Sequence, residues 1–110
     1  MVTSMYNKLV RDLIPEIIEK DGKTCETATL DADAYETKLL EKLREEALEL
    51  EHAEAQQDKL EEIADAMEVL HALAEYYGST ADEVEQIRLK KRAERGGFSR
   101  RTLLKQVDET

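Results

Sequence analysis

The sequence predicts an all-α protein, an antiparallel helical bundle of about four helices. Only one proline and four glycines occur in its 110 residues, which leaves little material for turns and favours long helices with short connections. Hydrophobic residues make up 41% of the chain, enough to fold it although 38% is charged. A chain of this length favours a single domain, residues 1–110.

The N-terminal third is predicted to hold one short helix followed by an extended segment. Apolar side chains recur there at helical spacing: Leu9, Val10, Leu13, Ile14, Ile17 and Ile18. Pro15 fits the first turn of this helix, where its missing N–H costs little, and Asp21-Gly22 ends it. Residues Lys23–Leu30 carry three threonines and no helical period, which predicts extended backbone.

Two long helices with a short connection are predicted in the middle of the chain. Asp33 and Glu36 have the spacing of a capping box and predict the start of a helix that runs to about His52. The turn is predicted at Ala55–Asp58, and a third helix follows it as far as Tyr77. Helices joined by so short a turn are expected to be antiparallel neighbours.

The last predicted helix is capped by Ser79 or Thr80, with acidic residues in its first turn near the positive end of the helix dipole. It ends near Gly96-Gly97. The tail, Phe98–Val107, is basic and then apolar, and it could form a short strand beside Lys23–Leu30.

The charge and cysteine content exclude several classes of partner. A net charge of −10 argues against nucleic acid and against an anionic membrane surface, because both would repel the chain. No stretch approaches the roughly 20 apolar residues of a membrane span. Cys25 is the only cysteine, so no intrachain disulfide is expected and a reducing compartment fits best. These features predict a soluble, cytoplasmic protein.

Two acids of the third helix fall where its apolar stripe should be. At roughly 100° per residue from Leu60, most of the apolar side chains cluster near about 300°: Ile63, Met67, Leu70, Ala74 and Tyr77. Val69 and Leu73 fall at about 180° and 220°, which makes the apolar arc unusually wide. Glu62 lies between those two, and Asp65 lies at the edge of the arc, so both are expected to point toward protein.

The second helix presents a similar acid pair. Glu46 falls only about 20° outside the apolar stripe, and Glu49 lies next to it at i+3. Four ionised carboxylates between packed helices would repel one another and lose hydration. A divalent cation removes that conflict, and hard oxygen ligands suit Mg²⁺, with Mn²⁺ as a substitute. From the angles alone, the four acids could equally be boundary residues that flank an interface.

Three segments together resemble a known family. Glu45–Glu49 followed by Glu62–Asp65 is similar to the EExxE…ExxD signature of the MazG-like, all-α nucleoside triphosphate pyrophosphohydrolases. The opening Tyr6–Asp12, with Ile14-Pro15, resembles the YNKLVRDxIP start of one branch, and Arg95–Phe98 resembles the C-terminal end of that branch. An EExxE motif alone is weak in so acidic a chain, but three segments in the right order are specific.

The resemblance implies an activity and a role for each acid. The family hydrolyses the α–β phosphate bond of a nucleoside triphosphate and releases a nucleoside monophosphate and pyrophosphate. By position, Glu46, Glu49, Glu62 and Asp65 correspond to the Mg²⁺ ligands. Glu45 and Glu46 are the catalytic candidates, with Glu45 in a supporting or water-orienting role. Family members often form homo-oligomers, dimers or tetramers, which is compatible with the wide apolar arc of the third helix.

A triphosphate needs cations beyond the metal. The candidates for substrate binding stand near the two ends of the chain: Lys8, Arg11, Lys91 and Arg95, with Arg100 beyond them. Arginine suits bidentate phosphate contact, and Gly96-Gly97 would let backbone amides approach an anion. The simpler interpretation is that they are surface charges, or charges favoured at the C-terminal end of a helix.

The base-binding side chains are less well defined. The short gap from Glu49 to Glu62 leaves little room for an inserted base-recognition element, so a base would rest on apolar side chains. Tyr6, Tyr76 and Tyr77 are candidates to assist, although a tyrosine in a small core more often serves packing. His52 and His71 are expected to be structural.

Two other functions stay open. Phosphoribosyl-ATP pyrophosphatase has a related fold and similar acid motifs, although the YNKLVRD-like opening disfavours it. A non-catalytic acidic helical module that binds a basic partner or oligomerises also fits the composition. The acid pairs inside apolar arcs count against that module, which would have no reason to bury them.

Overall fold

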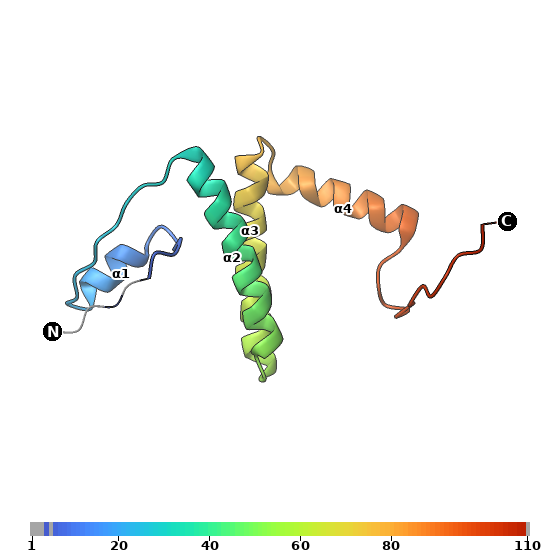
Figure 1. Ribbon diagram of the computed structural model, residues 1–110, viewed down its shortest axis with the longest axis horizontal. Coiled ribbons are helices and arrows are strands. Elements are labelled where there is room, and N and C mark those ends of the chain that lie inside the picture. Colours follow the sequence, from blue (N-terminus) through green and yellow to red (C-terminus); the bar gives the residue numbers. More distant parts are fainter. Residues whose placement is uncertain (1–3, 5, 110) are drawn as a thin grey trace.

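The computed structural model describes Ser4 and residues 6–109, and within them it is an all-helical structure (Figure 1). The helices are α1 (Ile14–Lys20), α2 (Ala32–His52), α3 (Gln56–Tyr76) and α4 (Ala81–Arg95). The all-α prediction is confirmed. No strand forms in the described residues, and Figure 1 shows the α1–α2 connection and the C-terminal tail on opposite sides of the molecule, too far apart to pair.

Two boundaries differ from the sequence prediction: the start of α2 and the connection between α2 and α3. Asp31, not Asp33, caps α2, because its Oδ1 atom accepts a hydrogen bond from the Ala34 N–H at 2.8 Å. The connection between α2 and α3 lies at residues 53–55, earlier than the predicted Ala55–Asp58. Asp58 is therefore inside the first turn of α3, where the helix dipole favours a carboxylate.

The junction of α3 and α4 is an elbow made by a tight helix end. Gly78 has a φ of 83°, and the hydrogen bonds from Gly78 N–H to Glu75 and from Ser79 N–H to Ala74 form a Schellman motif. Thr80, one of the two predicted caps, then accepts a hydrogen bond from the Glu83 N–H at 3.1 Å. From this elbow α4 runs away from the α2–α3 pair (Figure 1).

The core lies between α2 and α3. Leu39, Val69, Leu73 and Ala74 are the buried apolar side chains of the described residues, and α1 and α4 contribute none. Partly buried side chains complete this core: Leu9, Tyr35, Leu43, Ala72 and Tyr76. Leu9 brings the segment before α1 onto the helical pair. No helix in the described part of the chain is long and apolar enough to cross a membrane.

Candidate metal centre

Three glutamates from two helices meet beside the turn of the hairpin. Glu46 and Glu49 lie one turn apart on α2, and Glu62 lies in the second turn of α3, because the short antiparallel connection brings those stretches side by side. One carboxylate oxygen from each lies within 4.8 Å of the other two. These are three of the four metal ligands that the sequence predicts.

The centre of this cluster is buried between the helices. Glu46 is only 5% exposed, and it is the one buried charged residue in the described chain. Its helical angle predicts a place just outside the apolar stripe of α2, whereas in the structure it is buried. Glu46 Oε2 and Glu62 Oε2 are buried oxygens that no hydrogen-bond donor reaches. Lys42, one turn earlier on α2, is the nearest cation, with its Nζ atom 3.8 Å from Glu46 Oε1.

The pKa values of the Glu46, Glu49 and Glu62 carboxyls are all raised. Burial raises the pKa of Glu46, and the neighbouring charges of Glu49 and Asp65 add to the effect. Hydrogen bonding with Glu46 raises the pKa of Glu62, and hydrogen bonding with Glu62 raises the pKa of Glu49. Ionised carboxylates can only accept, so a shared proton or a cation would satisfy the buried oxygens of Glu46 and Glu62, whereas Glu49 is exposed.

Asp65 and Glu45 lie beside the cluster, each paired with a cation from the N-terminal segment. Arg11 Nη2 donates to Asp65 Oδ1 at 2.7 Å, and Lys8 Nζ donates to Glu45 Oε1 at 2.9 Å. The Lys8 hydrogen bond lowers the pKa of Glu45, so that side chain stays ionised. Asp65 is therefore near the three glutamates but is held by Arg11 instead of joining their oxygens.

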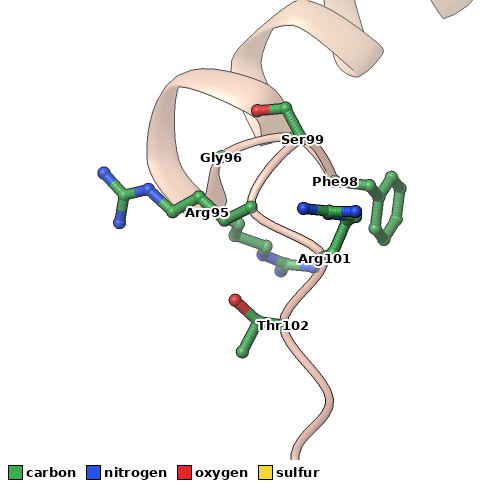
Figure 2. A pocket seen from close by; sticks show the side chains of 8 residues that line it. Arg95, Gly96, Phe98, Ser99, Arg101 and Thr102 are labelled. Carbon is green, nitrogen blue, oxygen red and sulfur yellow. The ribbon is translucent and has the colours of Figure 1, made fainter.

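The predicted substrate cations separate into two groups. Lys8 and Arg11 pair with Glu45 and Asp65, the two acids beside the cluster. Lys91 and Arg95 lie on α4, which starts at the other end of α3, about 21 Å along the helix axis from Glu62. Arg95 is the last residue of α4, and it borders a hollow formed by the loop after that helix (Figure 2). Arg100 borders the same hollow. Within one chain, the acids and this second group of cations are not brought together.

The predicted tyrosines and histidines lie outside the acidic cluster. Tyr76 and Tyr77 are at the far end of α3, where Tyr77 Oη donates to Glu36 Oε2 at 2.6 Å and the Tyr76 ring stacks edge-on against Tyr35. Tyr6 is exposed, and so are His52 and His71. Tyr76 packs against the core beside Tyr35, whereas Tyr77 is exposed.

Two lysines near the centre are not among the site residues that the sequence predicts. Lys42 faces Glu46, and the i,i+4 spacing of opposite charges was the signal for it. Lys38 Nζ donates to the Asn7 carbonyl at 3.2 Å, which fastens the N-terminal segment to α2. No sequence pattern indicates that contact, because it joins residues far apart in the chain.

Comparisons of this chain with models of protein families, with curated proteins and with solved structures found no match.

Proposed function

We propose that this chain is a Mg²⁺-dependent nucleoside triphosphate pyrophosphohydrolase of the MazG-like type. The observation that carries the proposal is the pair of buried oxygens, Glu46 Oε2 and Glu62 Oε2, which no donor reaches, inside a cluster of three carboxylates. A cation would satisfy such a cluster, and an all-oxygen ligand set favours Mg²⁺ or Mn²⁺ over zinc. The order of the YNKLVRD-like, EExxE…ExxD-like and RGGF segments supports a nucleotide as the substrate.

The three glutamates suit a single divalent ion in size and chemistry. Opposite oxygen ligands of one Mg²⁺ lie about 4.2 Å apart. The ligand oxygens of Glu46, Glu49 and Glu62 are already within 4.8 Å of one another, so small side-chain rotations would close them around an ion. When bound, the metal would supply charge neutralisation for the phosphates and would activate water.

The side chains around the cluster have the charges that this reaction needs. In the hydrolysis, a water oxygen bonds to phosphorus, the P–O bond between the α and β phosphates breaks, and pyrophosphate leaves. Glu45, kept ionised by Lys8, can accept a hydrogen bond from that water and orient it. Arg11 and Lys8 are exposed enough to turn from their carboxylates to substrate phosphates, and Asp65 would then be free to join the metal ligands.

The proposal places the enzyme in the cytoplasm, where nucleotides are its substrate pool, and treats it as a homo-oligomer. It acts on small phosphorylated molecules, and neither nucleic acid nor a membrane is its partner. The acidic surface is consistent with this, since only a metal-bound, partly neutralised phosphate would approach it readily.

Pyrophosphate release is the direct test. Purified protein is incubated with canonical and damaged nucleoside triphosphates and with phosphoribosyl-ATP, each with Mg²⁺, Mn²⁺ or EDTA. Release that needs metal, and that is lost in Glu46→Ala and Asp65→Ala, is the expected result. Glu61→Ala is the matched control, because Glu61 is an exposed acid next to Glu62.

The pattern of release decides between the candidate functions. Turnover of phosphoribosyl-ATP alone would replace this proposal with the pyrophosphatase alternative. No turnover of any substrate, together with no effect of Mg²⁺ on the melting temperature, would reject the enzyme and favour a non-catalytic helical module.

A further inference from the structure

Lys42 is the cation nearest to the buried carboxylates, and it has no role in the function proposed so far. Its Nζ atom lies 3.8 Å from Glu46 Oε1, which is an ion-pair distance but is too long for a hydrogen bond. Lys8 and Lys38, the neighbouring lysines, each donate a hydrogen bond within the chain. Among the described residues, the Lys42 ammonium group therefore has unused donors beside the acidic cluster.

The position of Lys42 on α2 holds its ammonium group close to the proposed metal ligands. Lys42 lies one turn before Glu46, and Glu45 is beside it at i+3. The Lys42 side chain is 25% exposed, whereas the Glu46 side chain is 6% exposed. Most of the lysine stem is thus covered, which restrains its direction, while part of the side chain stays open to a ligand.

The local charges show what Lys42 contributes once a metal ion is bound. Lys8 and Arg11 neutralise the two acids beside the cluster. The three glutamates of the cluster, when ionised, together with one divalent ion leave a single negative charge. Lys42 neutralises that remaining charge. A triphosphate is itself an anion, so it would be repelled by the metal-loaded cluster without Lys42 and would not be repelled with it.

The charge of Lys42 suits the leaving group of the proposed reaction. As the water oxygen bonds to the α phosphorus, the electron pair of the breaking P–O bond goes to the β phosphate, where negative charge grows. A cation placed at that phosphate stabilises this charge. An ammonium group has three donors and no acceptor, so it is suited to phosphate oxygens, whereas the Glu45 carboxylate is suited to the attacking water.

We propose that Lys42 is a substrate-binding residue, whose ammonium group turns from Glu46 to the phosphate chain and holds the pyrophosphate half of the substrate beside the three glutamates. This inference rests on the proposed function, because it needs a phosphate at the acidic cluster. It adds a residue to the cations that the sequence predicts near the two ends of the chain. α2 itself brings Lys42 to the glutamates, so no second chain is needed for this contact.

The test measures the binding of inorganic pyrophosphate to the full chain saturated with Mg²⁺, by isothermal titration. In Lys42→Met the side chain keeps a similar length but loses its charge. This variant is expected to bind pyrophosphate at least ~10-fold more weakly and to lose a similar factor in kcat/KM, as for one hydrogen bond between charged groups. A nucleoside monophosphate, the other product, is the second probe, and its affinity should stay within about twofold.

Control variants show whether the loss is specific to this position. Lys42→Arg keeps a cationic donor and should restore most of the pyrophosphate affinity. Lys20→Met removes the same charge from the exposed end of α1 and should leave the affinity within about twofold. Should Lys42→Met lose helix by circular dichroism, Lys42→Gln, which keeps a polar side chain, takes its place.

Metal binding separates a substrate contact from a structural role. Lys42→Met should bind Mn²⁺ at least as tightly as the unaltered chain, because it removes a cation beside the metal ligands. Glu62→Gln should lose Mn²⁺ binding instead. A Lys42→Met chain that loses Mn²⁺ and pyrophosphate together would show that Lys42 supports the cluster and does not contact the substrate.

The remaining outcomes distinguish this inference from the proposed function. Metal-dependent turnover with unchanged kcat/KM and unchanged pyrophosphate affinity in Lys42→Met would overturn the role of Lys42 and leave the enzyme in place. Equal weakening of pyrophosphate and monophosphate binding would overturn the assignment to the leaving group. An unaltered chain that neither binds Mn²⁺ nor releases pyrophosphate would reject the proposed function, and the role of Lys42 with it.

Discussion

The α2–α3 hairpin and the α4 helix are built from similar amphipathic, highly charged sequence, yet they reach different states. In the hairpin, each 21-residue helix provides the surface that the other needs, and Leu39, Val69 and Leu73 are buried. The 15-residue α4 is as regular and well capped, but it buries none of its side chains. Helical periodicity therefore determines where a helix forms, whereas burial depends on whether the chain supplies a second surface.

The two regions also divide the charge. The hairpin holds a surplus of carboxylates around buried oxygens that lack donors. Residues 90–105, which we call the basic arm, carry seven basic side chains and one acid. Each region carries what the other is missing. The four predictions below test whether that division reflects a metal centre in the hairpin and a partner-binding surface on α4.

The largest effect is expected from one acid inside the hairpin compared with its neighbour in sequence. Glu62→Gln should reduce metal-dependent pyrophosphate release at least ~100-fold, because it removes a metal ligand from the proposed centre. Glu61→Gln, on the exposed side of α3, should leave the rate within about twofold. Isothermal titration with Mn²⁺ measures binding directly. Equal activity and equal Mn²⁺ affinity in both variants would remove the distinction between buried and surface acids.

A smaller but more specific effect is expected when two inactive chains are mixed. This prediction rests on both the proposed activity and the proposed homo-oligomer, taken as a dimer. If Lys91 and Arg95 of one copy serve the acids of the other, Glu62→Gln chains mixed with Lys91→Ala/Arg95→Ala chains should recover about a quarter of the normal rate, since that is the share of intact sites after random pairing. Native mass spectrometry would report the mixed dimers. Mixed dimers without recovered activity would mean that the arm binds its partner but does not serve the substrate.

The sequence alone anticipated the helices and most of the acidic cluster. The periodicity of α3 predicts that Glu62 points toward protein, and in the structure it is half-buried beside Glu46 and Glu49 of α2. The periodicity does not determine which part of the wide apolar arc packs against α2, because helical angles contain no information about the partner surface. The position of the turn was also missed, since Gln56 to Asp58 have no strong helix-breaking residue and the capping preference of Ala55 is weak.

The cation contacts were predicted only in part. The sequence predicts Lys8 and Arg11 as substrate ligands, whereas in the structure they donate to Glu45 and Asp65. Those ion pairs join positions far apart in the sequence, so no spacing rule reveals them. The pair of Lys42 and Glu46 does follow such a rule, because opposite charges at i and i+4 are neighbours on a helix.

A pH effect of moderate size should distinguish the two kinds of carboxyl in the hairpin. The folded-state pKa values of Glu46, Glu49 and Glu62 are raised above 4.5, so the metal-free folded state binds more protons than the unfolded chain in the window above 4.5. Stability from these groups therefore grows as the pH falls from neutral into that window and is lost as the pH rises through it. The lowered pKa of Glu45 has the opposite sign, and its contribution is lost below 4.5.

The measurement is the melting temperature in EDTA as a function of pH. We expect it to rise on mild acidification and to fall again in stronger acid. Glu62→Gln should flatten the rise, and saturating Mg²⁺ should also do so, because the metal competes with protons for the same oxygens. A melting temperature that falls steadily from neutral pH downward would show that the cluster carries no repulsion.

The smallest effect is expected from two helix caps, and it returns to the difference between the hairpin and α4. Asp31→Ala and Thr80→Ala each remove one side-chain cap, at a local cost of about 1 kcal/mol. α2 unfolds together with the core, so Asp31→Ala should lower the melting temperature by about 4–8 °C. If α4 is the surface through which the proposed homo-oligomer forms, Thr80→Ala should instead raise the dissociation constant about fivefold.

The two cap variants therefore report through different measurements, melting at high concentration for α2 and dilution for α4. Amide hydrogen exchange along α4 should accelerate in Thr80→Ala at concentrations where the chain is dissociated, because little of its own chain then protects the helix. If Thr80→Ala lowered the melting temperature as much as Asp31→Ala, and equally at every concentration, α4 would be stabilised by its own chain. The contrast between a self-sufficient hairpin and a helix that depends on a partner would then be wrong, and the exposed apolar side chains of α4 would need another explanation.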